Sequence, residues 1–274
     1  MTATPASPMA PPDLLATIVA AARRIVEVRR QQVSESALEK AASKRKPAGD
    51  AFVRALRDGE APRVIAECKR RSPSRGILRE DYDAPAHARA YAAAGAAAIS
   101  VLTEPTFFDG SLDELSAVRA AVSVPVLRKD FVVSRYQILE AVAAGADAVL
   151  LIAGALSPSE LSGLIEQAHR AGVAALVEAH DADELRTALD CGAHIVGINS
   201  RNLRTLDVEP ELHERLAPLI PSDMVSVAES GLRELADLQR LARAGYKAFL
   251  VGERLITEPD PGAALRLLRK GTPS

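Results

Sequence analysis

Eight short apolar runs, many of them rich in Val and Ile, recur between residues 64 and 252, and they constrain the fold more than any other feature of the chain. Stretches rich in Ala, Leu, Glu and Arg with helical spacing separate them. Continuous apolar runs are typical of parallel strands that are buried on both faces. Eight such units of about 26 residues each predict an α/β fold, a (β/α)8 TIM barrel. The runs are Val64–Glu67, Ala98–Leu102, Pro125–Lys129, Ala148–Ile152, Ala174–Glu178, Ile195–Asn199, Val225–Glu229 and Ala248–Gly252.

The ends of the expected helices carry signals with the same rhythm. A glycine that accepts the left-handed conformation closes five helical stretches before a strand, and Ser or Asp followed three residues later by Glu or Gln opens four of them. A doubly wound open sheet is the alternative fold, but eight even units without an early G-x-G-x-x-G favour closure. The glycines are Gly95, Gly145, Gly172, Gly192 and Gly245, and the capping pairs are Ser111/Glu114, Ser134/Gln137, Ser157/Glu160 and Asp181/Glu184.

The segment before the first strand has a different character. Residues 1–12 are rich in Pro, Ala, Ser and Thr and are expected to be disordered. Helices are predicted over Leu14–Arg30 and Ala51–Leu56, with a polar connection over Glu39–Lys46 between them. The domain organisation expected is therefore a helical extension over residues 13–62 and a barrel over residues 63–270.

Composition excludes several classes of partner. Lys and Arg (34) nearly balance Asp and Glu (36), so the charge indicates no nucleic-acid partner. No apolar stretch is long enough for a membrane span and no signal segment opens the chain, so we expect a cytoplasmic protein without a membrane partner. The two cysteines fit a reducing compartment, and the five histidines lack metal-ligand spacing, so no metal is expected. The sequence does not reveal the oligomeric state.

Polar side chains stand at the carboxyl ends of five of the predicted strands. One charged residue at a strand end usually marks only the point where the chain meets solvent. Five ends on the same edge of a barrel indicate a site instead, because active sites of this fold lie on that edge. The residues are Glu67 and Lys69, Lys129 and Asp130, Glu178, Asn199 and Arg201, and Glu229 and Ser230.

Two further segments are candidates for binding an anionic ligand. Gly231 and Gly252 follow the seventh and eighth strands, where barrels of this kind bind phosphate through backbone N–H groups. A long basic segment, Cys68–Arg79, follows the first strand. It is either a solvated loop or a mobile flap that brings Lys69 and Ser72 over the substrate.

These motifs, taken in order, resemble the indole-3-glycerol-phosphate synthase family over roughly residues 12–270. The resemblance implies a TIM barrel that converts 1-(2-carboxyphenylamino)-1-deoxyribulose 5-phosphate into indole-3-glycerol phosphate, with loss of CO2 and water and without cofactor or metal. The motifs are Val64-Ile-Ala-Glu-Cys-Lys-Arg-Arg-Ser-Pro-Ser, Ala98-Ile-Ser-Val-Leu-Thr-Glu, Phe107-Phe-Asp-Gly-Ser-Leu, Pro125-Val-Leu-Arg-Lys-Asp-Phe, Leu176-Val-Glu-Ala-His-Asp, Gly197-Ile-Asn-Ser-Arg-Asn-Leu, Val227-Ala-Glu-Ser-Gly and Leu250-Val-Gly-Glu.

The resemblance also implies roles for individual residues. Lys129 matches the general acid, Lys69 the contact to the anthranilate carboxylate, and Glu67 and Glu178 the carboxylates that position the substrate and transfer protons. Asn199 and Ser230 complete the catalytic set, with Asn199 at a substrate hydroxyl. The remaining matches are to substrate-binding positions: Arg201 near the carboxylate, Phe108 and Phe131 around the ring, Glu229, and Ser72, Gly231, Gly252 and Glu253 with Ser230 on the phosphate side.

Two other functions remain as alternatives. Another phosphate-binding barrel, such as phosphoribosylanthranilate isomerase, would share the late glycines but lack the Glu67/Lys69 pair, Lys129 and the extension. A non-catalytic ligand-binding barrel would have lost at least one acid or base, and this chain has lost none.

Overall fold

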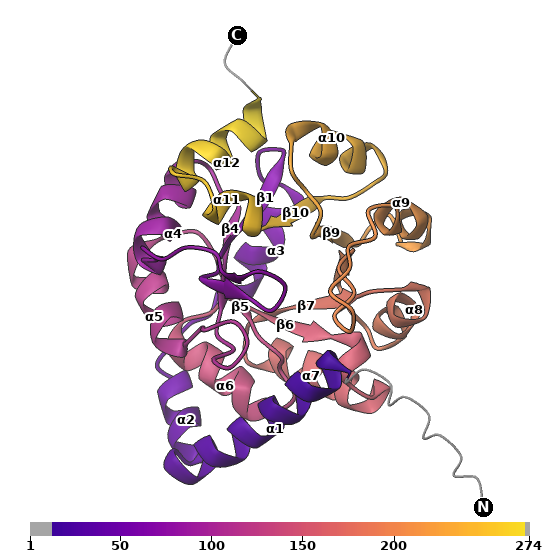
Figure 1. Cartoon of the computed structure of the whole chain (residues 1–274). Helices are drawn as coiled ribbons and strands as arrows, with labels where there is room; N and C mark the ends of the chain where they lie inside the picture. Colours follow the sequence, from indigo (N-terminus) through magenta and orange to yellow (C-terminus); the bar gives the residue numbers. More distant parts are fainter. Residues whose placement is uncertain (1–12, 272–274) are drawn as a thin grey trace, which may run out of the picture.

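Eight parallel strands close into a barrel, as the sequence predicts (Figure 1). The computed structural model describes residues 13–271, so the disorder expected at residues 1–12 falls outside the described residues. Each strand pairs with its neighbours along the chain, and the first pairs with the last. The strands are β1 (Arg63–Cys68), β4 (Ala98–Leu102), β5 (Val126–Lys129), β6 (Ala148–Ile152), β7 (Ala174–Ala179), β8 (Ile195–Asn199), β9 (Val225–Glu229) and β10 (Ala248–Val251).

Helices surround the barrel and cover the outer faces of its strands (Figure 1). Leu, Val and Ile side chains of the strands and helices form one continuous core between the two layers. The basic segment after β1 forms a small antiparallel hairpin, β2 (Arg71–Ser72) with β3 (Gly76–Ile77). The helices are α4 (Ala84–Ala93), α5 (Leu112–Ala121), α6 (Arg135–Ala144), α7 (Pro158–Arg170), α8 (Ala182–Asp190), α9 (Leu212–Leu216), α10 (Leu235–Arg243), α11 (Glu253–Ile256) and α12 (Pro261–Lys270), with 3-10 turns η1 (Ala153–Ala155) and η2 (Ala217–Leu219).

The helix ends follow the predicted signals, with one exception. All five helix-closing glycines have positive φ, and Ser157 with Glu160 forms a complete capping box. Ser134 is the N-cap residue of α6 as predicted, but the capping box predicted there is wrong, because the Ser134 hydroxyl makes no capping hydrogen bond. Gln137 instead braces the loop before α6, accepting from Val133 N at 2.8 Å and donating to Phe131 O at 3.0 Å.

Three helices precede the barrel: α1 (Leu14–Gln32), α2 (Glu35–Ala42) and α3 (Gly49–Arg57). The polar connection predicted over Glu39–Lys46 is wrong in its first half, which belongs to α2. Ser34 caps this helix, and Leu38 and Ala42, one turn apart, turn inward while α2 packs on α6. A mostly polar segment thus becomes helical through tertiary packing.

Helix α3 closes the amino-terminal end of the barrel. Its Phe52 and Leu56 are fully buried and α3 packs against β1, β4, β7 and β9. Burying side chains of this size stabilises the fold by about 2 kcal/mol each. Gly49 N donates to Gly172 O, just before β7, which ties α3 to this end. The carboxyl end is therefore the face available for a site.

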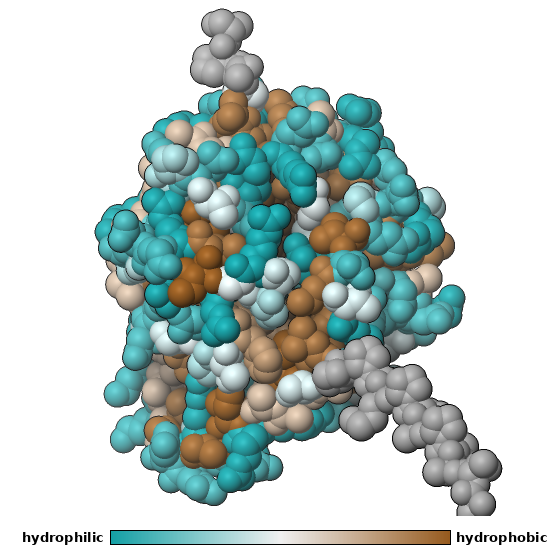
Figure 2. Space-filling model, viewed as in Figure 1, coloured by the Kyte–Doolittle hydropathy of each residue, from teal (hydrophilic) through white to brown (hydrophobic). Residues whose placement is uncertain are grey.

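The face seen in Figure 1 is the one that carries hairpin β2–β3. Hydrophilic side chains dominate its periphery, and hydrophobic groups gather toward the centre and lower right (Figure 2). None of the helices within residues 13–271 is long and apolar enough to cross a membrane.

Candidate active site

A cavity at the carboxyl ends of the strands collects nearly all of the residues singled out from the sequence. Gly231 and Gly252 line an adjoining cavity that shares Glu67, Ser230 and Glu253 with it. The first cavity is lined by the thirteen other residues predicted from the sequence, namely Glu67, Lys69, Ser72, Phe108, Lys129, Asp130, Phe131, Glu178, Asn199, Arg201, Glu229, Ser230 and Glu253.

Strand register explains why these side chains meet. Asn199 is paired with Glu229 across β8 and β9, and Glu178 is paired with Gly197 across β7 and β8. This register sets Asn199 beside Glu229 and places Glu178 two residues earlier, on the same inward-facing side. Side chains alternate along a strand, so Glu67 faces the interior while Cys68 faces the helices, where its Sγ contacts Ala84 O at 3.7 Å.

Lys129 lies at the centre of the cavity. Its Nζ donates to Glu178 Oε2 at 2.9 Å and lies 3.4 Å from Glu229 Oε2. Burial alone lowers the pKa of a lysine. The charges of Glu178, Glu229 and Glu67 outweigh burial and raise the pKa of Lys129 above its ordinary value, so the amine is an ammonium group.

The two carboxyl groups beside Lys129 differ in charge. Burial raises the pKa of Glu178, but Lys129 and His180 outweigh burial and hold it well below the ordinary range. Burial, offset only in part by Lys129 and reinforced by Glu178 and Glu67, raises the pKa of Glu229 to about 8. Neither Glu229 oxygen has a hydrogen-bond partner among the described residues. A carboxylate and a carboxylic acid therefore flank one ammonium group, as acid–base chemistry requires.

Two glycines make room for these carboxyl groups. A methyl group on Gly197 would overlap Oε1 of Glu229, and one on Gly252 would overlap Oε1 of Glu67. Sequence reasoning missed Gly197, although a glycine inside an apolar strand is a signal of close approach. Gly252 was expected on the phosphate side, and the structure adds this steric role.

The segment after β1 is ordered over the mouth of the barrel. Lys69 Nζ pairs with Glu67 Oε1 at 2.7 Å, and Ser72 is buried in hairpin β2–β3. Arg79, at the end of the segment, donates to Ile256 O at 3.0 Å and to Glu258 O at 2.7 Å. The basic segment thus contributes Lys69 and Ser72 to the cavity wall, while Arg71, Arg75 and Ile77 are exposed.

The side of the site on which the sequence predicts phosphate binding is built by the loops after β8, β9 and β10. Ser230 donates through Oγ to Asn199 Oδ1 at 2.7 Å, and Ser230 and Gly231 both have positive φ. Glu253 pairs with Arg75 at 2.9 Å and with Arg201 at 3.7 Å. The adjoining cavity is rich in arginines, Arg75, Arg201, Arg233, Arg240 and Arg254.

An apolar wall faces the charged cluster. Phe108 and Phe131 lie with ring centroids 6.1 Å apart. Sequence reasoning from polar strand ends missed the aliphatic part of this wall, although inward positions two residues apart on β6 and β10 could have identified much of it. That part comprises Leu102, Leu150, Ile152, Leu203, Leu206 and Leu250.

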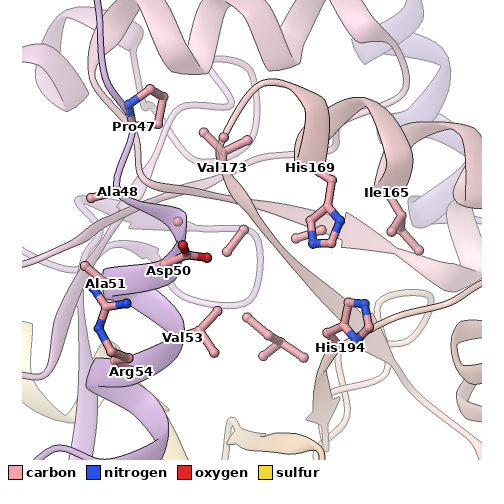
Figure 3. Close-up of a pocket in the computed structure, with 15 residues that line it drawn as sticks. Pro47, Ala48, Asp50, Ala51, Val53, Arg54, Ile165, His169, Val173 and His194 are labelled. Atoms are coloured by element: carbon pink, nitrogen blue, oxygen red, sulfur yellow. The ribbon is translucent and has the colours of Figure 1, made fainter.

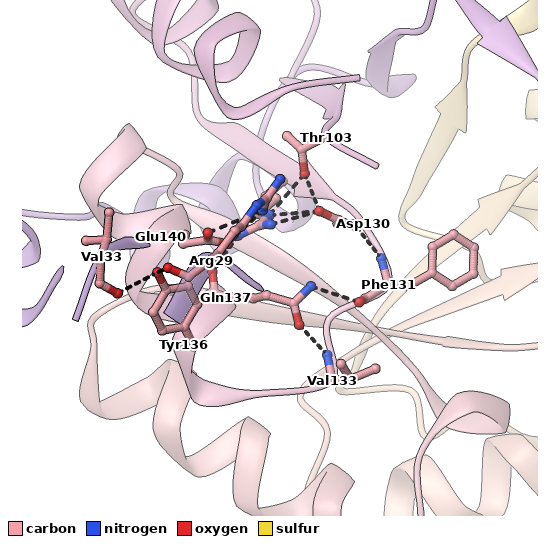
Figure 4. A network of polar contacts seen from close by, with 10 residues as sticks. Arg29, Val33, Thr103, Asp130, Phe131, Val133, Tyr136, Gln137 and Glu140 are labelled. Carbon is pink, nitrogen blue, oxygen red and sulfur yellow. Dashed lines mark hydrogen bonds and ion pairs between the residues drawn. The ribbon is translucent and has the colours of Figure 1, made fainter. Parts of the chain in front are cut away.

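A buried ionic network supports the strand that carries Lys129 (Figure 4). Arg128, fully buried and on the outer face of β5, pairs with Asp130 at 2.8 Å and with Glu140 of α6 at 3.2 Å. Arg29 of α1 shares the same Glu140 carboxylate at 3.2 Å. The helical extension is thus linked through two ion pairs to the residue next to Lys129.

A separate cavity, of about 580 Å³, lies at the amino-terminal end of the barrel (Figure 3). The rings of His169 and His194 stack there at 5.5 Å, across from Asp50 and Arg54 of α3. These four side chains are exposed, and no buried ionisable group is among its lining residues. The cluster suited to proton transfer therefore lies at the opposite end.

Comparison with known proteins identifies similar chains. A family model described as indole-3-glycerol phosphate synthase matches residues 15–268. An indole-3-glycerol phosphate synthase of Parafrankia sp. is 51% identical over 251 residues, covering 91% of this chain and 92% of the relative. Indole-3-glycerol phosphate synthase 1 of Streptomyces coelicolor is 49% identical, with 92% and 93% covered.

Solved structures with the same fold are more distant in sequence. A crystal structure of 3-hexulose-6-phosphate synthase has a TM-score of 0.61 at 16% identity and covers 76% of this chain and 99% of its own. N-acetylmannosamine-6-phosphate 2-epimerase from Clostridium perfringens has a TM-score of 0.58 at 16% identity, with 76% and 91% covered. At this identity the likeness concerns the barrel alone.

Proposed function

The chain belongs to the indole-3-glycerol phosphate synthase family, and on that premise we propose which of its residues carry out the reaction. The family is one of carboxy-lyases of tryptophan biosynthesis. The function is the ring closure of 1-(2-carboxyphenylamino)-1-deoxyribulose 5-phosphate to indole-3-glycerol phosphate, with loss of CO2 and water. The observation that carries our assignment is the position of Lys129 between Glu178 and Glu229.

Ring closure requires an electrophilic C2′ carbonyl. In our assignment Lys129 Nζ donates a proton to the carbonyl oxygen while the ring carbon that bears the carboxylate attacks C2′. The raised pKa of Lys129 keeps the proton on the amine until the developing alkoxide takes it. Glu178, within 2.9 Å of the same amine, holds it in place.

Decarboxylation follows without an electron-sink cofactor. The electrons of the breaking C–C bond return to the ring and neutralise the iminium-like intermediate. Lys69, paired with Glu67 at 2.7 Å, is assigned to the substrate carboxylate before it leaves as CO2. Arg201, on the opposite loop, lies near the same group in this assignment.

Dehydration completes the indole. The hydroxyl formed at C2′ takes a proton from Lys69, which is freed when the carboxylate leaves as CO2, and departs as water while a proton leaves C1′. We assign the ionised Glu178 as the acceptor of the C1′ proton, because its depressed pKa keeps it a carboxylate. Glu67 is assigned as the second carboxylate, which positions the substrate. Asn199, held by Ser230, and Glu229 are assigned to substrate hydroxyl groups.

Binding is divided between an apolar and a basic end of the site. Phe108 and Phe131 are suited to the anthranilate ring, and their 6.1 Å separation supports this. On the phosphate side we assign Ser72, Ser230, Gly231, Gly252 and Glu253, beside the arginines of the adjoining cavity.

We also propose that residues 13–62 act as an extension of the barrel over residues 63–270, in one functional unit. The burial of Phe52 and Leu56 under the barrel and the Arg29–Glu140 ion pair support this. A cytoplasmic location, proposed from the sequence, agrees with two free cysteines.

The assay is direct. Purified protein is mixed with 1-(2-carboxyphenylamino)-1-deoxyribulose 5-phosphate and indole fluorescence is followed. Turnover above a blank is expected, and its absence would contradict the proposal. A parallel assay with N-(5′-phosphoribosyl)anthranilate is expected to show no conversion, which separates this function from isomerase activity.

A further inference from the structure

His180 lies directly behind the active-site carboxylate Glu178, between two acidic side chains. Its Nε2 is 3.2 Å from Glu178 Oε1, and its Nδ1 is 2.9 Å from Glu184 Oε2. The imidazole is only 11% exposed and is not among the residues that line the cavity. It therefore contacts the catalytic cluster from outside, through Glu178.

Both ring nitrogens face carboxylate oxygens, which only accept hydrogen bonds. Nδ1 makes a hydrogen bond with Glu184, whereas Nε2 lies at ion-pair distance from Glu178 without an aligned hydrogen bond. A proton on both nitrogens, as in the imidazolium form, lets the ring face both carboxylates as a cation. Burial lowers the pKa of His180, but its contacts with Glu178 and Glu184 outweigh burial and raise the pKa to about 10. The positions of the two carboxylates and the raised pKa thus both indicate that the His180 imidazole is a cation at neutral pH.

Glu184 is itself held firmly. It is the third residue of α8, where its Oε2 also accepts from the backbone N–H of His180 at 2.9 Å. On its other side lies the backbone of η1, where Gly154 has no side chain, and a methyl group there would overlap Glu184 Oε1. Glu184 thereby fixes the orientation of the imidazole ring.

We propose that His180 is a positioning residue of the active site, whose imidazolium holds the Glu178 carboxylate ionised and turned toward Lys129. This inference rests on the proposed role of Glu178 as a proton acceptor. It assigns one Glu178 oxygen to each cation, Oε1 to His180 and Oε2 to Lys129.

The charges around Glu178 show why a second cation is needed. Lys129 approaches it from β5, Glu229 from β9, and Glu67 from β1 acts on the same cluster. Inside the barrel Lys129 therefore acts on three carboxyl groups, of which only Glu67 has a second ammonium partner, Lys69. When Lys129 donates its proton, His180 is the cation that still faces Glu178 and keeps it from taking that proton back.

The first experiment compares His180→Asn with wild type in pH profiles of kcat. Loss of the imidazolium raises the pKa of Glu178, so the acid limb, which reports protonation of the acceptor in the complex, moves to higher pH by about one unit. At pH 7 Glu178 stays ionised in this variant, and we expect kcat to fall about 10-fold because the carboxylate is no longer held turned toward Lys129. KM should change less than about 2-fold, because no substrate contact is lost. His194→Asn, at the other end of the barrel, is the matched control and retains wild-type values.

Two variants disturb the contact between His180 and Glu184 without removing the imidazole ring. Glu184→Gln keeps the shape but removes the charge, and Gly154→Ala displaces the Glu184 carboxylate. Both are expected to move the acid limb in the same direction as His180→Asn, by less. An acid limb that stays at its wild-type pH in all three variants overturns the proposal.

A measurement independent of turnover uses 15N NMR of the histidine rings, with His180 assigned by its loss in His180→Asn. Doubly protonated shifts at pH 8 are expected, and a neutral ring at that pH contradicts the inference. Lack of wild-type turnover would contradict the proposed function, whereas wild-type turnover with unshifted variants would contradict only the role of His180.

Discussion

The side chain of Glu67 fills the space beside Gly252 at the end of the barrel. A methyl group on the glycine would overlap Oε1 of the glutamate and approach its Cβ to 3.1 Å. The glycine that follows β10 was expected to let backbone N–H groups approach a phosphate. It also leaves room for the Glu67 carboxylate, which pairs with Lys69, beside the end of β10. The structure thus adds a steric role to the phosphate-side role predicted for Gly252.

Gly252→Ala is therefore expected to displace Glu67 and to lower kcat by about 10- to 100-fold, since small misplacements of catalytic groups cost this much. Far-UV circular dichroism should stay unchanged. Gly163→Ala, in α7 with open space around it, is the control and should keep full activity while raising stability by about 0.5–1 kcal/mol. Equal activity of the two variants would show that Glu67 needs no such space.

Lys129→Ala removes the only cation within ion-pair distance of both Glu178 and Glu229 among the described residues. We expect kcat to fall on the order of 100-fold or more, because proton donation to the C2′ carbonyl is lost. Lys247→Ala, before β10 at the amino-terminal end, tests for the general effect of losing a lysine. Near-native kcat in Lys129→Ala would rule out its role as general acid.

Glu229 and Glu178 should affect stability with opposite signs. The pKa of Glu229 rises from 4.5 to about 8 on folding, so the folded state holds a proton that the unfolded chain releases, and stability falls as pH rises between these values. Glu229→Gln removes this cost. Its thermal unfolding temperature should match wild type at pH 4.5 and exceed it by a few degrees at pH 8.

Glu178→Gln is the matched variant. The pKa of Glu178 is depressed on folding, so its stabilising contribution is present above the ordinary pKa and is lost as pH falls through the folded-state value. This variant should be less stable than wild type at pH 7, with the difference shrinking in acid. The same sign of change in both variants would contradict the assignment of one carboxylate and one carboxylic acid.

The two ion pairs of Glu140, with Arg128 and with Arg29, should contribute unequally to the free energy of unfolding. Glu140→Gln leaves the buried Arg128 with Asp130 as its one acidic partner within the described residues, and should lower the free energy of unfolding by on the order of 3 kcal/mol. Arg29→Gln breaks a more exposed pair and should cost about 1 kcal/mol or less. Urea unfolding measures both, and equal losses would show that Arg128 draws no stability from Glu140.

Much of the site could be predicted because strand ends are local signals. Lys129, Glu178 and Asn199 each stop an apolar run, and chain order alone brings such ends to one edge of a barrel. Helix α2 could not be predicted in the same way, because its stability comes from packing on α6. The roles of individual residues in catalysis stay predictions until the variants above are measured.

The sequence by itself determined the order of strands and helices, the closed barrel and the edge on which the polar residues gather, because hydrophobic periodicity and capping act over a few residues. The tertiary structure alone decided how those residues are charged. Glu178 and Glu229 are the same residue type at the same kind of position, yet one is ionised and the other protonated. Their pKa values depend on distances to Lys129, His180 and Glu67, which lie on other strands or beyond a strand end, and no local pattern encodes those distances.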